Sequence, residues 1–135
     1  MTGVQTCALP IFYNALLETD EPALVIECLN GYRLKEKMPT NLGNFKTPIG
    51  EIEILKSGTD ITLVSYGSTL RLVQQAASEL LEIGIDCEVI DIQSLLPFDF
   101  HQDIVKSIQK TSRLLIIDED VPGGASAFIL QQIIE

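Results

Sequence analysis

Three consecutive acids, Asp118, Glu119 and Asp120, follow an apolar run, LLII, late in the chain. Acids in this position hold the magnesium ion of many nucleotide hydrolases. Those enzymes also need a GxxxxGK[ST] loop, whose backbone amides hold the phosphates, and the sequence contains none. We therefore interpret the three acids as the solvent-facing carboxyl end of a buried strand.

Glycine stands at two junctions where a strand pattern gives way to a helix pattern. Gly67-Ser68-Thr69 offers either backbone amides to an anion or a plain N-cap through Ser68, and a single glycine favours the cap. Gly123-Gly124 leaves the same two alternatives and is interpreted as backbone freedom after the acidic strand end.

The other candidate residues do not combine into a site. His101, the one histidine, has no Ser or Cys partner in a hydrolase-like setting and is interpreted as a surface residue. Asp86, Asp91 and Asp99 lie on separate elements and indicate no carboxylate dyad. No CxxC or Cys/His spacing indicates zinc. The residues themselves therefore predict no catalytic, cofactor-binding or metal-binding position in this chain.

The composition is that of a globular domain with an acidic surface. The chain has 135 residues, is 46% hydrophobic and carries a net charge of −10. Such a surface repels phosphate backbones and anionic lipid, so we expect no nucleic-acid and no membrane partner. Cys28 and Cys87 lie in apolar runs, where a free cysteine acts as a small hydrophobe. We expect a reduced, cytoplasmic protein.

Apolar periodicity predicts alternating strands and helices. The clearest helix begins after Gly67-Ser68, ends at Gly84, and places Val73, Ala76, Ala77 and Leu80 on one face. Asp99 and Gln102 have the spacing of a capping box for a helix over 100–110. The other predicted helices cover 12–19 and 125–135, and the predicted strands cover 23–28, 51–55, 61–66, 87–92 and 113–117.

The late strands are apolar on both faces, which indicates helices on both sides of a sheet. We therefore predict an α/β fold, an open and mostly parallel sheet covered by helices on both faces. The strands over 61–66, 87–92 and 113–117 are expected to be parallel, with 61–66 at the centre. Residues 30–48 are rich in Gly, Pro and Asn and are interpreted as a linker.

The first residues, MTGVQTCALPI, are uncharged and aperiodic. They lack the basic region of a secretory signal and are too short to cross a membrane. Because GVQTCALPI resembles the translation of a common sequencing adapter, we expect residues 1–11 to be a non-native leader. A genuine disordered N-terminal arm is the alternative. The last residues, QQIIE, carry no helix-stop signal, and we expect a fragment truncated at both ends.

Four motifs follow one another in a fixed order: GTDITLVSYG over 58–67, GIDCEVID over 84–91, SLLPFD over 94–99, and the late GG. In this order they resemble the β-subunit, or the fused α/β form, of the thiamine-diphosphate-dependent 2-oxo acid dehydrogenases of pyruvate and branched-chain type. The resemblance covers residues 12–135. It implies that 12–29 end a pyrimidine-binding domain, that 30–48 form a linker, and that 49–135 form an incomplete transketolase-type C-terminal domain.

The resemblance implies oxidative decarboxylation of a 2-oxo acid on thiamine diphosphate and Mg, with acyl transfer to lipoyl groups. In this family the cofactor and catalytic residues lie upstream or on the α part, so the fragment is expected to bind neither cofactor and to be inactive alone. Its implied role is assembly with the α-subunit or α part and a second β-subunit, and docking on the lipoyl acyltransferase core. Tyr32 and Arg33 correspond to a family Tyr-Arg near the active-site approach, where Arg33 would steer a carboxylate or form an ordinary loop ion pair.

Two alternatives come from other classes of protein. Transketolase and deoxyxylulose-phosphate synthase share this C-terminal domain, although the linker here lacks the arginine patterns expected for their phosphate sites. A non-catalytic α/β binding module would explain the fold without any reaction.

Overall fold

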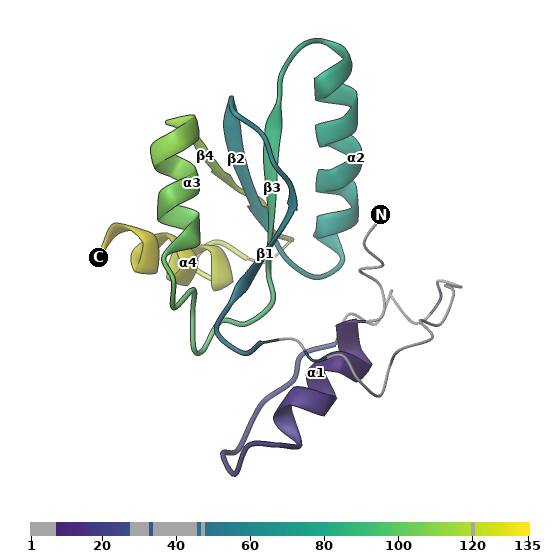
Figure 1. Ribbon diagram of the computed structural model, residues 1–135, viewed down its shortest axis with the longest axis vertical. Helices are drawn as coiled ribbons and strands as arrows, with labels where there is room; N and C mark the ends of the chain where they lie inside the picture. Colours follow the sequence, from purple (N-terminus) through teal and green to yellow (C-terminus); the bar gives the residue numbers. More distant parts are fainter. Residues whose placement is uncertain (1–7, 28–32, 34–45, 47, 120) are drawn as a thin grey trace. The chain divides into compact units, whose positions relative to one another are not determined.

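The computed structural model describes residues 8–27, 33, 46, 48–119 and 121–135 (Figure 1). The chain divides into two compact units, Met1–Ile49 and Gly50–Glu135, and each is described by itself. Over the described residues, no helix combines the length and the apolar character that crossing a membrane requires.

The second unit is a four-stranded sheet with the strand order β1-β3-β2-β4. β2 pairs in parallel with both β3 and β4, and β1 pairs antiparallel with β3. The predicted trio of parallel strands, with residues 61–66 between its neighbours, is therefore confirmed. The elements in chain order are β1 (Ile52–Lys56), β2 (Ile61–Ser65), α2 (Thr69–Glu82), β3 (Cys87–Ile92), α3 (Asp103–Thr111), β4 (Leu114–Ile116) and α4 (Ala125–Ile134).

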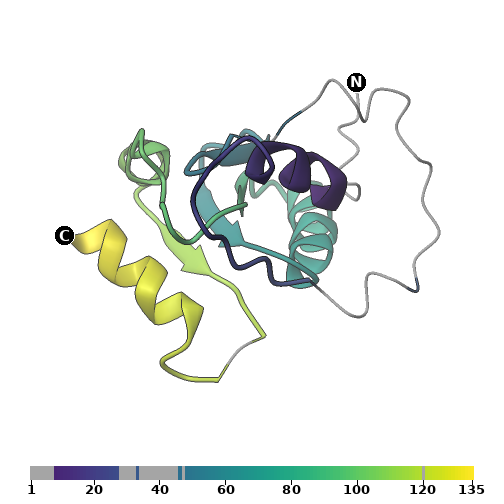
Figure 2. The ribbon, with the colours of Figure 1, turned by 90° about the horizontal axis from the view of Figure 1, so that it is seen from below.

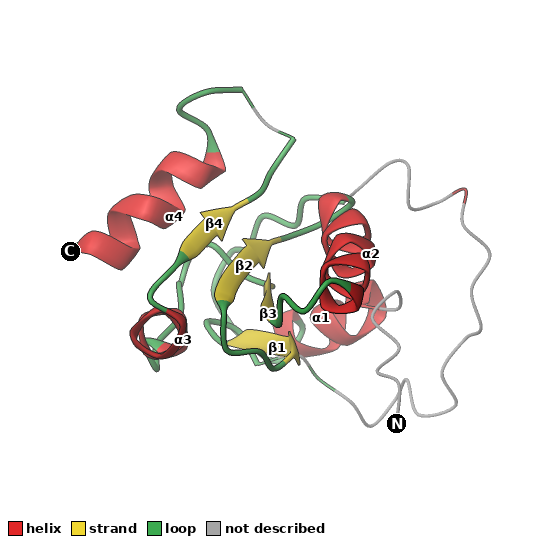
Figure 3. Cartoon of the chain, turned by 90° about the horizontal axis from the view of Figure 1, so that it is seen from above, coloured by secondary structure: helices red, strands yellow, loops and turns green. Residues whose placement is uncertain are grey.

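Helices cover both faces of this sheet, which confirms the predicted fold class (Figures 2 and 3). α2 packs on one face, and α3 and α4 pack on the other. Successive side chains of a strand point to opposite faces, so a sheet covered on both sides has strands that are apolar throughout. The α2 layer buries Leu63, Leu70, Val73, Ala77, Cys87 and Val89. The opposite layer buries Val64, Ile90, Ile92, Ile104 and Ile129.

Helix α2 begins and ends where predicted, but the Ser68 side chain does not cap it. Gly84 has φ +86°, and the N–H groups of Gly84 and Ile85 close the last carbonyls of the helix in a Schellman motif. Ser68 stands at the predicted N-cap position, but its backbone is helical (φ −65°, ψ −31°) and its hydroxyl makes no capping bond. Leu70 is buried on the inner face, whereas Ala76 is exposed on its flank.

Helix α3 begins at Asp103, later than the predicted residue 100. Asp99 and Gln102 both have a left-handed backbone, with φ +30° and +54°, which interrupts a helix before Asp103. The predicted capping box is absent, since Gln102 makes no side-chain capping bond. Asp99 instead caps from further upstream, because its two carboxylate oxygens accept the N–H groups of Asp103 and Ile104, each at 2.9 Å.

The first unit holds α1 (Ala8–Leu16), which begins earlier than the predicted 12–19 and therefore within residues 1–11. The predicted strand over 23–28 is wrong over its described part, since residues 23–27 form no strand. Leu24 and Ile26 are 87% and 80% exposed. A strand needs a neighbouring strand to pair its backbone groups, and the described residues of this unit form no strand that could be that neighbour. The non-native origin of residues 1–11 stays a prediction.

Candidate functional site

The carboxyl ends of β2, β3 and β4 lie at one edge of the sheet, the carboxyl edge, because these strands are parallel. After β2 the chain passes to α2 on one face, and after β4 it passes to α4 on the other (Figure 2). The connections that follow the neighbouring strands β2 and β4 therefore leave toward opposite faces of the sheet. Open α/β sheets usually bind ligands at such a switch point, so the carboxyl edge between β2 and β4 is the candidate site.

Two acids from the end of β4 occupy this candidate site. Asp118 accepts a hydrogen bond from the N–H of Ser126, in the first turn of α4, at 3.0 Å. Glu119 accepts one from the hydroxyl of Ser68, directly before α2. Helix N-termini attract anions, and here Asp118 accepts a first-turn N–H of α4 while Glu119 places a second carboxylate beside the start of α2. The described residues therefore do not fit a diphosphate, which would meet this negative charge.

The hydroxyl groups at the same edge are not arranged as nucleophiles. Ser65 donates to the carbonyl of Ile117 at 2.9 Å, and Ser68 donates to Glu119, so within the described chain neither hydroxyl is bonded to an imidazole. His101 is exposed, and its Nε2 lies 3.5 Å from Oε1 of Glu51. Acyl transfer through an activated serine needs a base in hydrogen-bond reach of the hydroxyl, which this arrangement does not supply.

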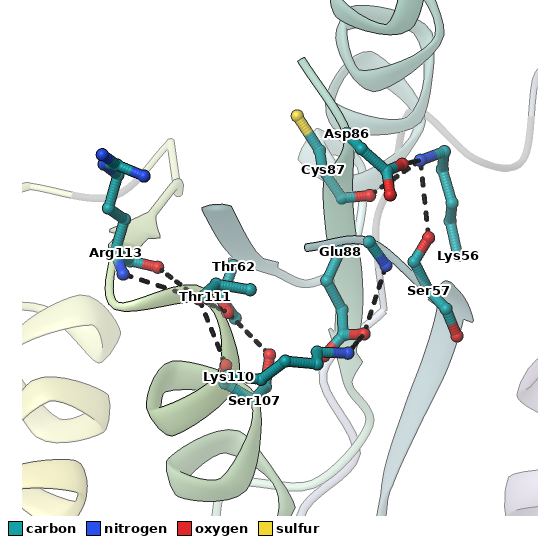
Figure 4. A network of polar contacts seen from close by, with 11 residues as sticks. Lys56, Ser57, Thr62, Asp86, Cys87, Glu88, Ser107, Lys110, Thr111 and Arg113 are labelled. Carbon is teal, nitrogen blue, oxygen red and sulfur yellow. Dashed lines mark hydrogen bonds and ion pairs between the residues drawn. The ribbon is translucent and has the colours of Figure 1, made fainter. Parts of the chain in front are cut away.

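The opposite edge of the sheet, the amino edge, carries a network of paired polar groups (Figure 4). At its outer end, Nζ of Lys56 on β1 lies 2.6 Å from Asp86 and donates to the carbonyl of Cys87 at 2.9 Å. The hydrogen bond from Lys56 lowers the pKa of the Asp86 carboxyl. This ion pair ties the end of β1 to the start of β3.

Glu88 is the most deeply buried charge of the network. Only 2% of its side chain is exposed, and it pairs with Lys110 from α3. Burial alone would raise the pKa of Glu88. Three donors outweigh that effect and hold this pKa below its ordinary value: Lys110, the Ser107 hydroxyl and the Gly58 N–H. The carboxylate is therefore ionised and joins α3 to β3.

Three buried hydroxyl groups continue the network. Thr62 Oγ1 lies 2.6 Å from Ser107 Oγ and 2.7 Å from Thr111 Oγ1 (Figure 4). Because each buried group has a partner, the network is a structural tie between β2 and α3 rather than a binding site. The sequence analysis missed it. Its signals were Glu88 inside an apolar strand and Ser107 with Thr111 on the inward face of α3.

A different carboxyl group lies between β1 and β3. Asp91 is 9% exposed, and Glu53 of β1 stands directly opposite it in the antiparallel register. Burial raises the pKa of Asp91 to about 7, the charge of Glu53 adds to this, and a hydrogen bond from Gln93 opposes it. The sequence analysis treated Asp91 only as one of three separated acids. Its partner across the strands is a fourth acid, Glu53, which the sequence analysis did not consider.

The two predicted approach residues, Tyr32 and Arg33, belong to the first unit. Tyr32 lies outside the described residues, and Arg33 is exposed. Their role stays a prediction. Within 8–27, 33, 46, 48–119 and 121–135, no group of three or more His, Cys, Asp or Glu residues is placed to hold a metal ion. A magnesium–diphosphate group thus finds no matching donor set in the described part of the chain.

Comparison with known proteins gives consistent matches. Residues 50–135 match the family model "Transketolase, C-terminal domain". The pyruvate dehydrogenase E1 component subunit beta of Chlorokybus atmophyticus is 38% identical over 97% of this chain and 39% of that protein. The mitochondrial 2-oxoisovalerate dehydrogenase subunit beta 2 of Arabidopsis thaliana is 42% identical over 68% of this chain and 26% of that protein.

A solved structure described as "Split gene transketolase, inactive beta4 tetramer" superposes with a TM-score of 0.59 at 28% identity, over 65% of this chain and 29% of that one. The chain spans well under half the length of each of these relatives. The family match covers the whole second unit, whose mixed sheet and flanking helices have just been described. The chain therefore belongs to the transketolase C-terminal domain family.

Proposed function

We propose that this chain is the C-terminal part of the β component of a thiamine-diphosphate-dependent 2-oxo acid dehydrogenase. The support is the similarity to pyruvate dehydrogenase subunit beta over 97% of the chain. The parent reaction would be oxidative decarboxylation of a 2-oxo acid with acyl transfer to lipoyl groups. Thiamine diphosphate supplies the carbanion chemistry of such a reaction when it is bound.

Within that parent enzyme, this segment serves assembly rather than chemistry. The observation that carries this proposal is the candidate site itself, where Asp118 accepts a first-turn N–H of α4 and Glu119 places a second carboxylate beside Ser68, directly before α2. Thiamine diphosphate and Mg would then be held by residues outside the described ones. The partners in assembly would be the α-subunit or α part and a second β-subunit, with docking on the lipoyl acyltransferase core.

Exposed apolar side chains on the second unit support an assembly role. Leu72 on α2 is 67% exposed, and Leu96 and Phe100 between β3 and α3 are 80% and 64% exposed. Exposed apolar surface of this kind favours contact with other protein. A cytoplasmic location is part of the same proposal.

A transketolase parent is the second candidate, because the split transketolase structure shares the fold at 28% identity. The two candidates differ in substrate: one decarboxylates a 2-oxo acid, and the other transfers a two-carbon unit between sugar phosphates. They also differ in the need for a lipoyl acceptor.

The test is to clone the coding sequence that flanks this chain and to express the intact protein together with its α component. We expect thiamine-diphosphate-dependent decarboxylation of pyruvate or a branched-chain 2-oxo acid, and acylation of a free lipoyl domain. Transfer from a ketose phosphate without 2-oxo acid turnover would support the transketolase candidate instead. A flanking sequence without any thiamine-diphosphate domain would contradict both.

A further inference from the structure

Strand β1 lies at the edge of the sheet and is held by β3 alone. Its register places Glu53 directly opposite Asp91, with Ile52 opposite Ile92 on one side of this pair. Side chains directly opposite in an antiparallel pair lie on the same face, with Cβ atoms about 5 Å apart. The one strand that joins this unit to the preceding residues therefore carries a carboxyl group facing a second carboxyl group.

The nearest polar neighbours of this pair in the sheet, Ser65 and Gln93, are uncharged. On β2, the neighbour of Asp91 is Ser65, and beyond Asp91 on its own chain the amide of Gln93 donates to Glu53 at 2.8 Å. Helix α2 packs on this face with apolar residues, and its charged side chains, Arg71, Glu79 and Glu82, are exposed. The three lysines of the second unit pair with other acids: Lys56 with Asp86, Lys106 with Asp103 and Lys110 with Glu88.

Two physical effects both disfavour the state in which Asp91 and Glu53 are ionised together. Asp91 is 9% exposed, and burial disfavours the charged form of a carboxyl group. Like charges directly opposite in a sheet also destabilise the strand pairing. Close carboxyl groups of this kind titrate as a pair, with one proton retained to higher pH. The pKa of Asp91, raised to about 7 by its burial and by Glu53, places that last proton near neutral pH.

We propose that the Glu53–Asp91 pair makes the attachment of β1 to the sheet depend on pH, so that β1 is held while the pair keeps a proton and loosens once both carboxyl groups ionise. The attachment of β1 weakens with rising pH, because the closed sheet binds the proton more tightly than the open one. The closed sheet holds it up to the raised pKa, whereas a solvated Asp91 releases it near 3.8. Closure of β1 therefore weakens as the pH rises from about 4 to about 7, and changes little above that range.

Hydrogen exchange of the β1 amides in the 135-residue chain tests this directly. Protection factors of residues 52–56, corrected for intrinsic exchange, should fall by up to about tenfold per pH unit between pH 5 and pH 7, the slope for one proton. Protection in β2 should change much less. Asp91→Asn should abolish the dependence in β1, and Glu53→Gln should move it to lower pH. Glu82→Gln, an exposed acid on α2, should leave the wild-type profile unchanged.

Carbon-13 titration of the side-chain carboxyl groups gives a second readout that needs no variant. The Asp91 carboxyl should titrate near pH 7. An Asp91 carboxyl titrating near its ordinary value would overturn the proposal. So would β1 protection that follows β2 at every pH, or an Asp91→Asn chain that keeps the wild-type profile.

Discussion

The two edges of the sheet give their acids different kinds of partner. At the amino edge two carboxylates have a lysine as partner: Lys56 pairs with Asp86, and Lys110 with Glu88 (Figure 4). At and near the carboxyl edge, several acids instead have backbone N–H groups, a hydroxyl, the Gln93 amide or another carboxyl group as partners. Asp118 accepts from the backbone of α4, for example, and Asp91 faces another carboxyl group.

The amino edge therefore contributes mainly to stability, whereas the carboxyl edge is the place where a ligand or partner would bind. Paired charges and close backbone packing at the amino edge fasten β1, β3 and α3 into one body. The acids at the carboxyl edge lie where open α/β sheets usually bind ligands. One acid near this edge, Asp91, has a pKa of about 7, so its charge changes near neutral pH. The amino edge should therefore respond strongly to substitution at neutral pH, and the carboxyl edge should respond weakly or in the opposite sense.

The largest effect is expected at Gly58, on the amino edge. A Cβ on this residue would lie 2.2 Å from the backbone carbon of Cys87, and backbone on that strand cannot move aside. Gly58→Ala should lower the free energy of unfolding by about 3 kcal/mol, measured by urea denaturation. Gly84→Ala is the matched control, since Gly84 has open space and only a left-handed backbone, and it should cost about 1 kcal/mol. Equal losses would contradict the close packing at Gly58.

The next effect concerns the buried ion pair. Lys110→Met leaves Glu88 buried without its cation and should lower the free energy of unfolding by about 2 kcal/mol at pH 7, below the usual cost because Lys110 is 45% exposed. Adding Glu88→Gln should recover most of this loss. The pKa of Glu88 is lower in the folded protein than in the unfolded chain. The stabilisation by ionised Glu88 is therefore complete above the unfolded pKa, and it is lost as the pH falls through the folded pKa. Lys106→Met removes an exposed pair and is the control, with a change within about 0.5 kcal/mol.

At Asp91, removing the charge should stabilise the protein instead of destabilising it. Its folded pKa, about 7, lies above the unfolded value of 3.8, so wild-type stability falls as the pH rises through this window. Asp91→Asn should therefore raise the free energy of unfolding by about 1–2 kcal/mol at pH 8, with little gain at pH 4. Thermal denaturation at the two pH values measures the difference. A loss of stability at pH 8 would place Asp91 with the paired acids of the amino edge.

The smallest effect is expected at Ser68. Its hydroxyl contacts an exposed carboxylate, Glu119, and makes no capping bond to α2. Ser68→Ala should change the free energy of unfolding by less than about 0.5 kcal/mol, measured by urea denaturation. A loss near 1 kcal/mol would indicate the N-cap that the sequence predicted.

The sheet was predictable because its signals are local. Apolar runs bounded by turn residues indicate parallel strands, and β3 has the predicted bounds of 87–92. The start of α3 was not predictable from the same rules, because Asp99 adopts a left-handed backbone and caps the helix from upstream. The strand expected over 23–28 failed for a related reason, since pairing partners cannot be read from a strand's own residues.

The polar pairs were missed because their partners lie far apart in the sequence. Glu88 meets Lys110 from a separate helix, and Glu53 meets Asp91 only through the register of two distant strands. The candidate site could be located in part: the acids after β4 were identified, and their position at the strand end was expected. That Asp118 closes the first turn of α4 required the fold.

The central claim is that this chain serves assembly and holds no cofactor site of its own. Calorimetric titration of the isolated 135-residue chain with thiamine diphosphate and magnesium tests it most directly, with a decarboxylation assay on the same sample. We predict no saturable heat and no turnover of pyruvate or branched-chain 2-oxo acids, because the carboxylates of Asp118 and Glu119 already lie at the starts of α4 and α2 on the carboxyl edge. Saturable binding of one cofactor per chain, or measurable decarboxylation, would contradict it.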